Sequence, residues 1–381
     1  DDLLFDLSLT DEQRMNRETM QRFAAQEMRD PGKRVDAGEQ PADACYQQMA
    51  ELGVALLSIP EALGGAGMPR SPLSNALILE DLAHGDMALT LGATAPLGVV
   101  NTLLDQGSDA QREKYLPQFC SGEFVAATTA LLEPRATFDP TTPRTTATSN
   151  ADGFTLQGKK VMVPLGADAR LTLVIAMLDE KQPAAFIVEG TPAGMTRSVE
   201  ENMGLAGAQL ATLSFENVQL PADALLGEGS FDLQRFIDLS RIGICALAVG
   251  TCQAVLDYVV PYCNERVAFG EPISNRQAVA FMVADIAIEL EAMRLMTWRA
   301  ASLADRGEDF HEQAYLAKVF CAEHARRATS RWPWLYPRAS GRALVPQSAR
   351  NRHTGRRGLR LTPALKSTQC SATPFRNFSH D

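Results

Sequence analysis

The hydrophobic pattern of this chain changes its period twice, and this order limits the possible folds more than any single motif. From about residue 7 to 119, apolar residues recur at the three- and four-residue spacing of helices. Between about 124 and 220 they alternate in short runs bounded by Gly, Pro, Asn and Asp, as strands do. Helical spacing returns from about 231 to 325. A helical chain interrupted by strands predicts an α-bundle divided around a β-domain.

Local signals support the first helical segment. Thr10 and Gln13 form the S/T-x-x-E/Q pattern, in which each side chain bonds the backbone of the other residue at a helix start. A turn-forming stretch at 58–67 interrupts the helical pattern, which resumes after Pro72 and continues to Leu104.

The middle segment contains two kinds of strand signal. Residues 154–158 and 213–220 alternate between apolar and polar side chains, whereas 171–177 and 185–189 are short apolar runs. We therefore expect a β-barrel or sandwich inserted between the helical segments.

In the last helical segment, one set of apolar residues predicts the face that packs into the core: Phe281, Ala284, Ile288, Ala292 and Leu295. The charged residues Glu289, Glu291 and Arg294 lie outside this stripe.

These patterns predict a multidomain α+β fold. We expect an N-terminal α-helical domain over 1–122, a middle β-barrel domain over 123–228 and an incomplete C-terminal helical bundle over 229–330. Residues 331–381 form a tail, and the chain from 326 onward has five prolines and no helical period. No strand is followed by GxGxxG, so neither a Rossmann nor a P-loop nucleotide site is expected.

The composition is that of an ordinary soluble globular protein, with 45% hydrophobic and 22% charged residues. We see no apolar run that approaches the roughly 18 residues of a membrane span, and the acidic start is unlike a secretory signal. The seven cysteines are scattered, without a CxxC pair or a nearby His. This indicates reduced cytoplasmic thiols and neither a disulfide framework nor a metal site.

Charge is distributed unevenly along the chain. Residues 1–325 hold 45 acidic against 24 basic residues, whereas 326–381 hold eleven Arg and one Lys against the single acid Asp381. The acidic body would repel nucleic acid. A basic tail on its own could bind nucleic acid or an acidic partner, which is an alternative function.

Five strings occur in an order and spacing that resemble the acyl-CoA dehydrogenase family. Residues 59–67 resemble its PExxGGxG turn, 132–139 its TEPxxGSD loop, and 158–164 its GxKxWIT strand. Residues 203–229 resemble its MG…FxxVxVP…LLGxxG segment, and 265–277 its ERxxFGxxxxxxQ helix end. Together the strings cover about residues 8–325.

The resemblance implies FAD as cofactor and an acyl-CoA thioester as substrate. In this family a carboxylate removes the α-proton while the β-hydrogen leaves as hydride to the flavin, which fits a role in fatty acid β-oxidation. FAD lies between the β-domain and the second helical domain, in dimers or tetramers in which a neighbour completes the site. Electron-transfer flavoprotein or a similar protein is the implied acceptor. A homo-oligomer, or a heteromer with another family member, is the implied assembly.

The resemblance places three cofactor-binding residues near residue 270. Arg266 matches the arginine that grips the FAD pyrophosphate of the adjacent subunit, a task that suits a guanidinium because it can bond two oxygens. Gln277 matches an adenine-side contact, and Phe269 packs near the cofactor. An ordinary solvated arginine at a helix end and a plain polar helix residue remain open interpretations of Arg266 and Gln277.

The flavin-facing loop departs from the family pattern. The residues that the resemblance assigns to this loop are Leu131, Leu132, Met162, Val163 and Pro164. Leu132 replaces a Thr, Met162 replaces a shielding Trp, and Pro164 replaces the Thr that supports flavin N5. Proline has neither a hydroxyl nor a backbone N–H, so the polar contacts to the flavin are weakened.

The resemblance assigns Phe138, Asp238 and Arg241 to the substrate side. Phe138 belongs to the small Gly-Ser part of the family loop, and Arg241 matches an arginine near the catalytic base. A salt bridge within the bundle is an equal alternative for Arg241.

No catalytic base can be identified in this sequence. One branch of the family has its Glu immediately before this arginine, where the present chain has Ser240. The other family position lies near the C-terminal end, and residues 326–381 contain no Glu.

A shift of reading frame explains the tail better than a diverged extension does. Codons can be chosen for residues 331–357 so that the next frame reads G-x-G-F, then REHPVERWYR, then LEG, like the missing family end. Loss of the final helix would leave apolar faces of 281–325 uncovered, and such patches promote aggregation. The altered loop also supports a second hypothesis, a non-catalytic homologue or a subunit of a heteromeric complex.

Overall fold

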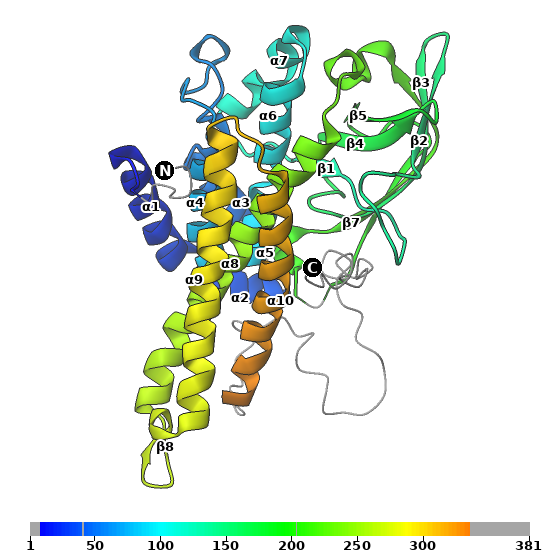
Figure 1. The fold of residues 1–381 in the computed structure, drawn as a ribbon. Helices are drawn as coiled ribbons and strands as arrows, with labels where there is room; N and C mark the ends of the chain where they lie inside the picture. The colour runs from blue at the N-terminus through cyan, green and yellow to red at the C-terminus, as the bar shows by residue number, and fades with distance from the viewer. Residues whose placement is uncertain (1–7, 40–41, 203, 336–381) are drawn as a thin grey trace, which may run out of the picture.

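The computed structural model describes residues 8–39, 42–202 and 204–335, with no account of the side chains of 331–335. Helices at both ends of this part of the chain enclose one side of a β-sheet, which lies apart from the long helical hairpin in Figure 1. Helical domain, β-domain and helical bundle therefore follow one another as the two changes of period predict.

The N-terminal domain has seven α-helices within its described residues. They are α1 (Asp11–Phe23), α2 (Arg29–Asp36), α3 (Asp43–Glu51), α4 (Pro72–Gly85), α5 (Met87–Ala93), α6 (Ala95–Gln106) and α7 (Asp109–Tyr115). A π-helical turn, Ala24–Met28, joins α1 to α2.

The capping signals of this domain are confirmed. The Thr10 hydroxyl accepts from the Gln13 backbone N–H at 3.1 Å, and the Gln13 side chain accepts from the Thr10 N–H at 3.0 Å. Ser71 caps α4 by accepting from the Ser74 N–H, with Pro72 at the first helical position, where no N–H is needed.

The middle domain is a seven-stranded sheet. Its strands are β1 (Ala127–Ala130), β2 (Thr146–Asn150), β3 (Gly153–Val163), β4 (Leu171–Leu178), β5 (Gln182–Glu189), β6 (Met195–Val199) and β7 (Ala211–Pro221). The order is β1-β4-β2-β3-β7-β6, with β5 also paired to β4. Strand β6 lies at one end of this order and pairs with β7, whereas β5 pairs with β4. Among the described residues no pairing joins β5 to β6.

Strand β4 is buried on both faces, which explains its unbroken apolar run. Leu173 and Ile175 pack in one cluster with helical residues such as Val99. Val174 and Ala176 pack in a second cluster that includes residues of β3 and β7. A strand covered on two sides cannot show the alternation of a half-exposed strand.

The C-terminal bundle consists of α8 (Leu233–Glu265), α9 (Gln277–Asp305) and α10 (His311–Leu335). A small hairpin of β8 (Val267–Ala268) and β9 (Glu271–Pro272) joins α8 to α9 and lies at the far end of the two helices in Figure 1. Helix α10 continues through Leu335, so the expectation of no helical period from residue 326 is wrong for its first ten residues. The rest of the tail, 336–381, lies outside the described residues.

Helix α8 corrects the expectation about apolar segments. It is long and apolar enough to meet the criteria for a membrane span, and 56% of its most apolar window is buried inside the protein. It packs against α4, α9 and α10, as the core helix of a bundle does. Its hydropathy therefore fits burial among helices.

The predicted core stripe of α9 is also wrong. Phe281 is 64% exposed and Ile288 69% exposed, while the buried residues of this helix include Ile286, Leu290 and Met293. Both faces of α9 are apolar, and only one of them packs against α8 and α10. The predicted stripe is a surface that the described residues leave uncovered.

Candidate active site

The turn at Pro164, which the resemblance assigns to the flavin and which we call the flavin-facing turn, follows directly from β3. Gly166 donates its N–H to the Val163 carbonyl at 3.1 Å, which closes a tight turn with Pro164 and Leu165 at its centre. Leu165 has φ 53°, an unusual conformation for a side chain of its size. Its side chain is nevertheless buried, in one apolar cluster with residues of the N-terminal domain. Packing against that domain thus holds the turn.

The turn presents apolar surface where the family has polar groups. Met162, at φ 57°, donates its N–H to the Glu200 carboxylate at 2.8 Å. Pro164 is half-buried and has no N–H. The donor of Met162 is therefore already engaged, and Pro164 offers none.

The loop beside this turn is fixed by a buried ion pair. Lys160 is fully buried and donates to the Glu133 carboxylate at 3.0 Å and to the Leu131 carbonyl at 3.1 Å. The Leu132 carbonyl accepts from the Val161 N–H at 2.9 Å. Leu131 and Leu132 are thereby held next to the end of β3, although each is only half-buried.

Glu133 is satisfied from several directions. Its carboxylate accepts from the N–H groups of Arg144 and Thr145 and from the Thr145 hydroxyl, at 2.9 to 3.0 Å. Burial alone would raise the pKa of Glu133, but Lys160 and these donors lower it below its usual range. Burial in turn lowers the pKa of Lys160 to about 8, against the attraction of Glu133.

Phe138 is buried within its own loop. The guanidinium of Arg135 lies 5.3 Å from the Phe138 ring centroid, and Arg135 also approaches Glu133 at 3.4 Å. The ring belongs to the Glu133 network by this contact.

Asp238 and Arg241 form a bundle salt bridge. The Asp238 carboxylate, 2% exposed, accepts from Arg241 at 2.7 Å and from Gln234 at 3.0 Å, and lies 2.9 Å from His311. His311 begins α10, so these contacts join α8 to α10. Of the two open interpretations of Arg241, the structure favours the bundle salt bridge.

The residues near 270 lie in a different place. Arg266 ends α8 and Gln277 begins α9, and both are exposed. Phe269, at φ 58°, is 94% exposed, and the Arg276 guanidinium lies 4.9 Å from its ring centroid. Figure 1 shows this hairpin far from the sheet, so one chain does not bring the two groups of predicted cofactor residues together.

An open cavity of about 170 Å³ lies between α4, α6 and α8. Ser240 lines it, whereas Asp238 and Arg241 do not. One stripe of its wall consists of Thr94, just before α6, and Gly98, Asn101 and Asp105 of α6. Leu97, which also lines the cavity, shares a buried cluster with Leu165 of the turn. The cavity and the turn thus both border the apolar cluster of the N-terminal domain.

Sequence reasoning missed this stripe and Arg70, which completes the charged part of the wall. The signal was present in α6, where small and polar residues recur at helical spacing on an otherwise apolar helix.

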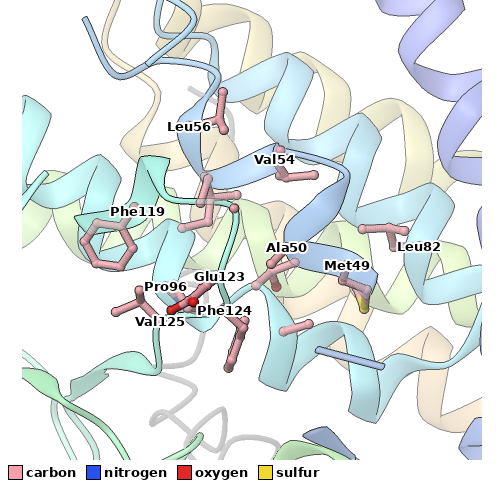
Figure 2. A pocket seen from close by; sticks show the side chains of 16 residues that line it. Met49, Ala50, Val54, Leu56, Leu82, Pro96, Phe119, Glu123, Phe124 and Val125 are labelled. Carbon is pink, nitrogen blue, oxygen red and sulfur yellow. The ribbon is translucent and has the colours of Figure 1, made fainter. Parts of the chain in front are cut away.

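Two other hollows are less suited to an acyl group. The pocket in Figure 2 has a volume of about 40 Å³, and Glu123 is its only charged lining residue. It has about a quarter of the volume of the cavity between α4, α6 and α8. A groove of about 580 Å³ between α1, α4, α8 and α9 is lined by charged side chains. There Glu80 and Asp81 are paired with Arg17 and Arg294.

Sequence models of one family match all three segments. The N-terminal, middle and C-terminal domains of acyl-CoA dehydrogenase match residues 10–123, 128–218 and 227–333. The chain therefore belongs to the acyl-CoA dehydrogenase family, an oxidoreductase family whose cofactor is FAD.

Individual relatives agree with this assignment. The chain is 35% identical over 332 residues to "Probable acyl-CoA dehydrogenase YngJ" of Bacillus subtilis, covering 84% of this chain and 86% of the relative. It is 31% identical to the mitochondrial short-chain specific acyl-CoA dehydrogenase of Bos taurus, covering 95% and 88% of the two chains. The solved butyryl-CoA dehydrogenase of Megasphaera elsdenii superposes with a TM-score of 0.80 at 30% identity, over 89% and 91% of the chains.

The residues that could hold FAD form two separate groups, and neither group is a complete site. Half-buried Leu131, Leu132 and Met162 offer apolar surface for a ring system. Arg266 and Phe269 offer an exposed cation and an exposed aromatic ring on one short hairpin. Since these parts lie apart in one chain, both fit a dinucleotide only if a second chain brings them together.

Proposed function

We propose that this chain binds FAD and a short acyl-CoA thioester as an acyl-CoA dehydrogenase, and that its α,β-desaturation activity is weak. The cavity between α4, α6 and α8 carries this proposal, because Ser240 lines it and its Leu97 belongs to the apolar cluster that also contains Leu165 of the turn. The names of the relatives, which include short-chain and butyryl-CoA dehydrogenases, favour a short acyl group.

In this proposal α4, α6 and α8 surround the acyl chain and exclude water from it. FAD, when bound, supplies the hydride acceptor. The α-proton requires a base, and Ser240 occupies one family position for it with a hydroxyl that bonds the Phe236 carbonyl at 2.8 Å. A serine hydroxyl is not a carboxylate base, so we infer slow proton removal.

The two parts of the FAD site favour a homo-oligomer. Arg266, Phe269 and Gln277 lie at the end of the α8–α9 hairpin, away from the middle domain of their own chain (Figure 1). The uncovered face of α9 with Phe281 and Ile288 offers a surface for a second copy. Electron-transfer flavoprotein remains our proposed acceptor and the cytoplasm the proposed location.

Gly98 provides the direct test of the cavity. A Cβ built on Gly98 meets no atom within 4 Å, so a leucine side chain can enter the cavity without moving the backbone. We expect Gly98→Leu to weaken binding of butyryl-CoA about tenfold or more, measured by titration calorimetry, while the fold is kept. Gly98→Ala, which adds only a methyl group at the same position, is the control for added volume. Gly190→Ala on an exposed turn would be a poor control, because an alanine is strained at the Gly190 φ of 58°. Equal affinities for wild type and Gly98→Leu would place the acyl group elsewhere.

Ser240 tests the chemistry separately. Ser240→Glu places a carboxylate where one branch of the family has its base, and the side chain is exposed to the cavity. A positioned general base contributes roughly 10²- to 10⁴-fold in rate, so we expect at least a hundredfold faster reduction of an artificial acceptor with butyryl-CoA. Ser240→Gln has nearly the same shape without the carboxylate and should stay slow. A gain in both variants, or in neither, would contradict this role for position 240.

We also propose, as a second candidate, a non-catalytic subunit of a heteromeric complex. Pro164, Ser240 and the uncovered stripe of α9 favour it, since they combine a weakened site with a free surface. Co-purification with a family member that has an intact loop and a catalytic Glu would support this candidate. A stable homo-oligomer that binds butyryl-CoA and FAD by itself would eliminate it.

A further inference from the structure

The cavity between α4, α6 and α8 is polar at one end. Arg70, just before α4, and Asp105, in the last turn of α6, line this end together with Asn101. Gln106, at the end of α6, exchanges hydrogen bonds with the backbone of Asp232, which precedes α8. The polar end is therefore where α4 begins, α6 ends and α8 begins.

The opposite end of the cavity is mainly apolar. Leu79 lies farther along α4, and Leu97 lies near the start of α6. Leu97 shares its buried cluster with Leu165 of the flavin-facing turn. Ser240 lies about two turns into α8, which begins at the polar end, so the polar end is the one farther from Ser240.

Hydrogen-bonding groups at the polar end are left unused. The Nη1 atom of Arg70 is buried without an acceptor, and the Oδ1 atom of Asn101 is buried without a donor. Asp105 lies 3.4 Å from Arg70 Nε, close enough for charge attraction but without hydrogen-bond geometry. Burial lowers the pKa of Arg70, and the carboxylates of Asp105 and Asp305 oppose that fall.

Such atoms are costly in a protein that has no ligand for them. A buried polar group without a partner loses its hydration and gains nothing in return, whereas a ligand that bonds it restores that loss. Arg70 offers donors and Asn101 offers an acceptor. A group that both accepts and donates, such as a hydroxyl, therefore satisfies both residues at once. A carboxylate would satisfy Arg70 alone and would also face Asp105.

We propose that Arg70 and Asn101 select a short acyl group with a hydroxyl near its far end, over the plain acyl group of the same length. This inference rests on the proposed function, because it assigns the cavity to the acyl part of an acyl-CoA. The apolar wall then contacts the hydrocarbon, and the polar end contacts the hydroxyl.

Binding to the full-length protein tests the selection without requiring turnover. We would measure dissociation constants for butyryl-CoA, 4-hydroxybutyryl-CoA and succinyl-CoA by titration calorimetry. We expect 4-hydroxybutyryl-CoA to bind roughly tenfold more tightly than butyryl-CoA, the scale of one buried polar group regaining its partner. Equal binding of these two, or tightest binding of succinyl-CoA, would overturn the inference while leaving the proposed function intact. Binding of none of the three would overturn both.

Substitutions at Arg70 and Asn101 test whether these two residues select the hydroxyl. Arg70→Met keeps the length of the side chain and removes its donors, and should reduce the preference for 4-hydroxybutyryl-CoA over butyryl-CoA to about onefold. Asn101→Ala removes the acceptor from the other side and should act in the same direction if Arg70→Met does not fold. Arg22→Met, on the exposed surface of α1, is the control and should keep the full preference. A loss of affinity for all three thioesters alike in Arg70→Met would place Arg70 at the CoA part and refute the selection.

Discussion

The two groups of predicted FAD residues have opposite surroundings. In the middle domain, Leu131 and Leu132 are held by a network whose central residues, Lys160 and Glu133, are 0% and 4% exposed. On the α8–α9 hairpin, Arg266 and Gln277 are exposed and Phe269 is 94% exposed. Described residues of the same chain enclose the first region, whereas the side chains of the second are exposed in the part of the chain that the structure describes. The same ligand can thus depend on one part that is built for stability and another that is built for contact.

The sharpest test of this comparison is to break the buried network. Removing one partner of a buried ion pair leaves an uncompensated charge and typically costs about 3–5 kcal/mol. We expect Lys160→Met to lower the free energy of unfolding by about that amount, measured by urea denaturation. Lys159→Met changes the adjacent exposed lysine and should have little effect. A small loss in Lys160→Met would show that the network does not support the middle domain.

A substitution on the α8–α9 hairpin should change FAD binding and leave the stability of the protein unchanged. Arg266→Ala should leave the stability of the FAD-free protein unchanged and weaken FAD binding roughly thirtyfold, because a hydrogen bond to a charged group contributes about 1.5–3 kcal/mol. The measurement is quenching of flavin fluorescence on titration with protein. Arg299→Ala, an exposed arginine of α9, is the matched control. Unchanged FAD affinity in Arg266→Ala would support the interpretation of Arg266 as a solvated arginine at a helix end.

Sequence predicted the order of the domains well because hydrophobic period depends on local geometry. The capping pair Thr10 and Gln13 and the apolar run at 171–177 both correspond to observed elements. The period could not tell which apolar face of α9 is covered, since Phe281 and Ile286 lie on different faces of one helix and only Ile286 is buried. Burial depends on neighbours distant in the sequence.

The candidate site was harder to predict for the same reason. The family resemblance identified the turn at Pro164, but it gave no information on side chains that meet only in the fold. The pair Lys160 and Glu133 joins residues 27 positions apart. Arg70 and Asp105 meet across a cavity that three helices form.

The smallest expected effect is at Pro164, where the middle domain lacks a polar group that the family has. Pro164→Thr restores a hydroxyl and a backbone N–H at the first central position of the turn, and one added hydrogen bond contributes about 1 kcal/mol. We therefore expect FAD to bind about fivefold more tightly. Loss of the proline should lower the free energy of unfolding by about 0.4–1 kcal/mol, since the unfolded chain gains freedom. Pro164→Val has the shape of threonine without its hydroxyl, so the difference between these two variants isolates the hydroxyl. If both bind FAD equally, the hydroxyl does not reach the flavin, and the apolar character of this turn is not what weakens the site.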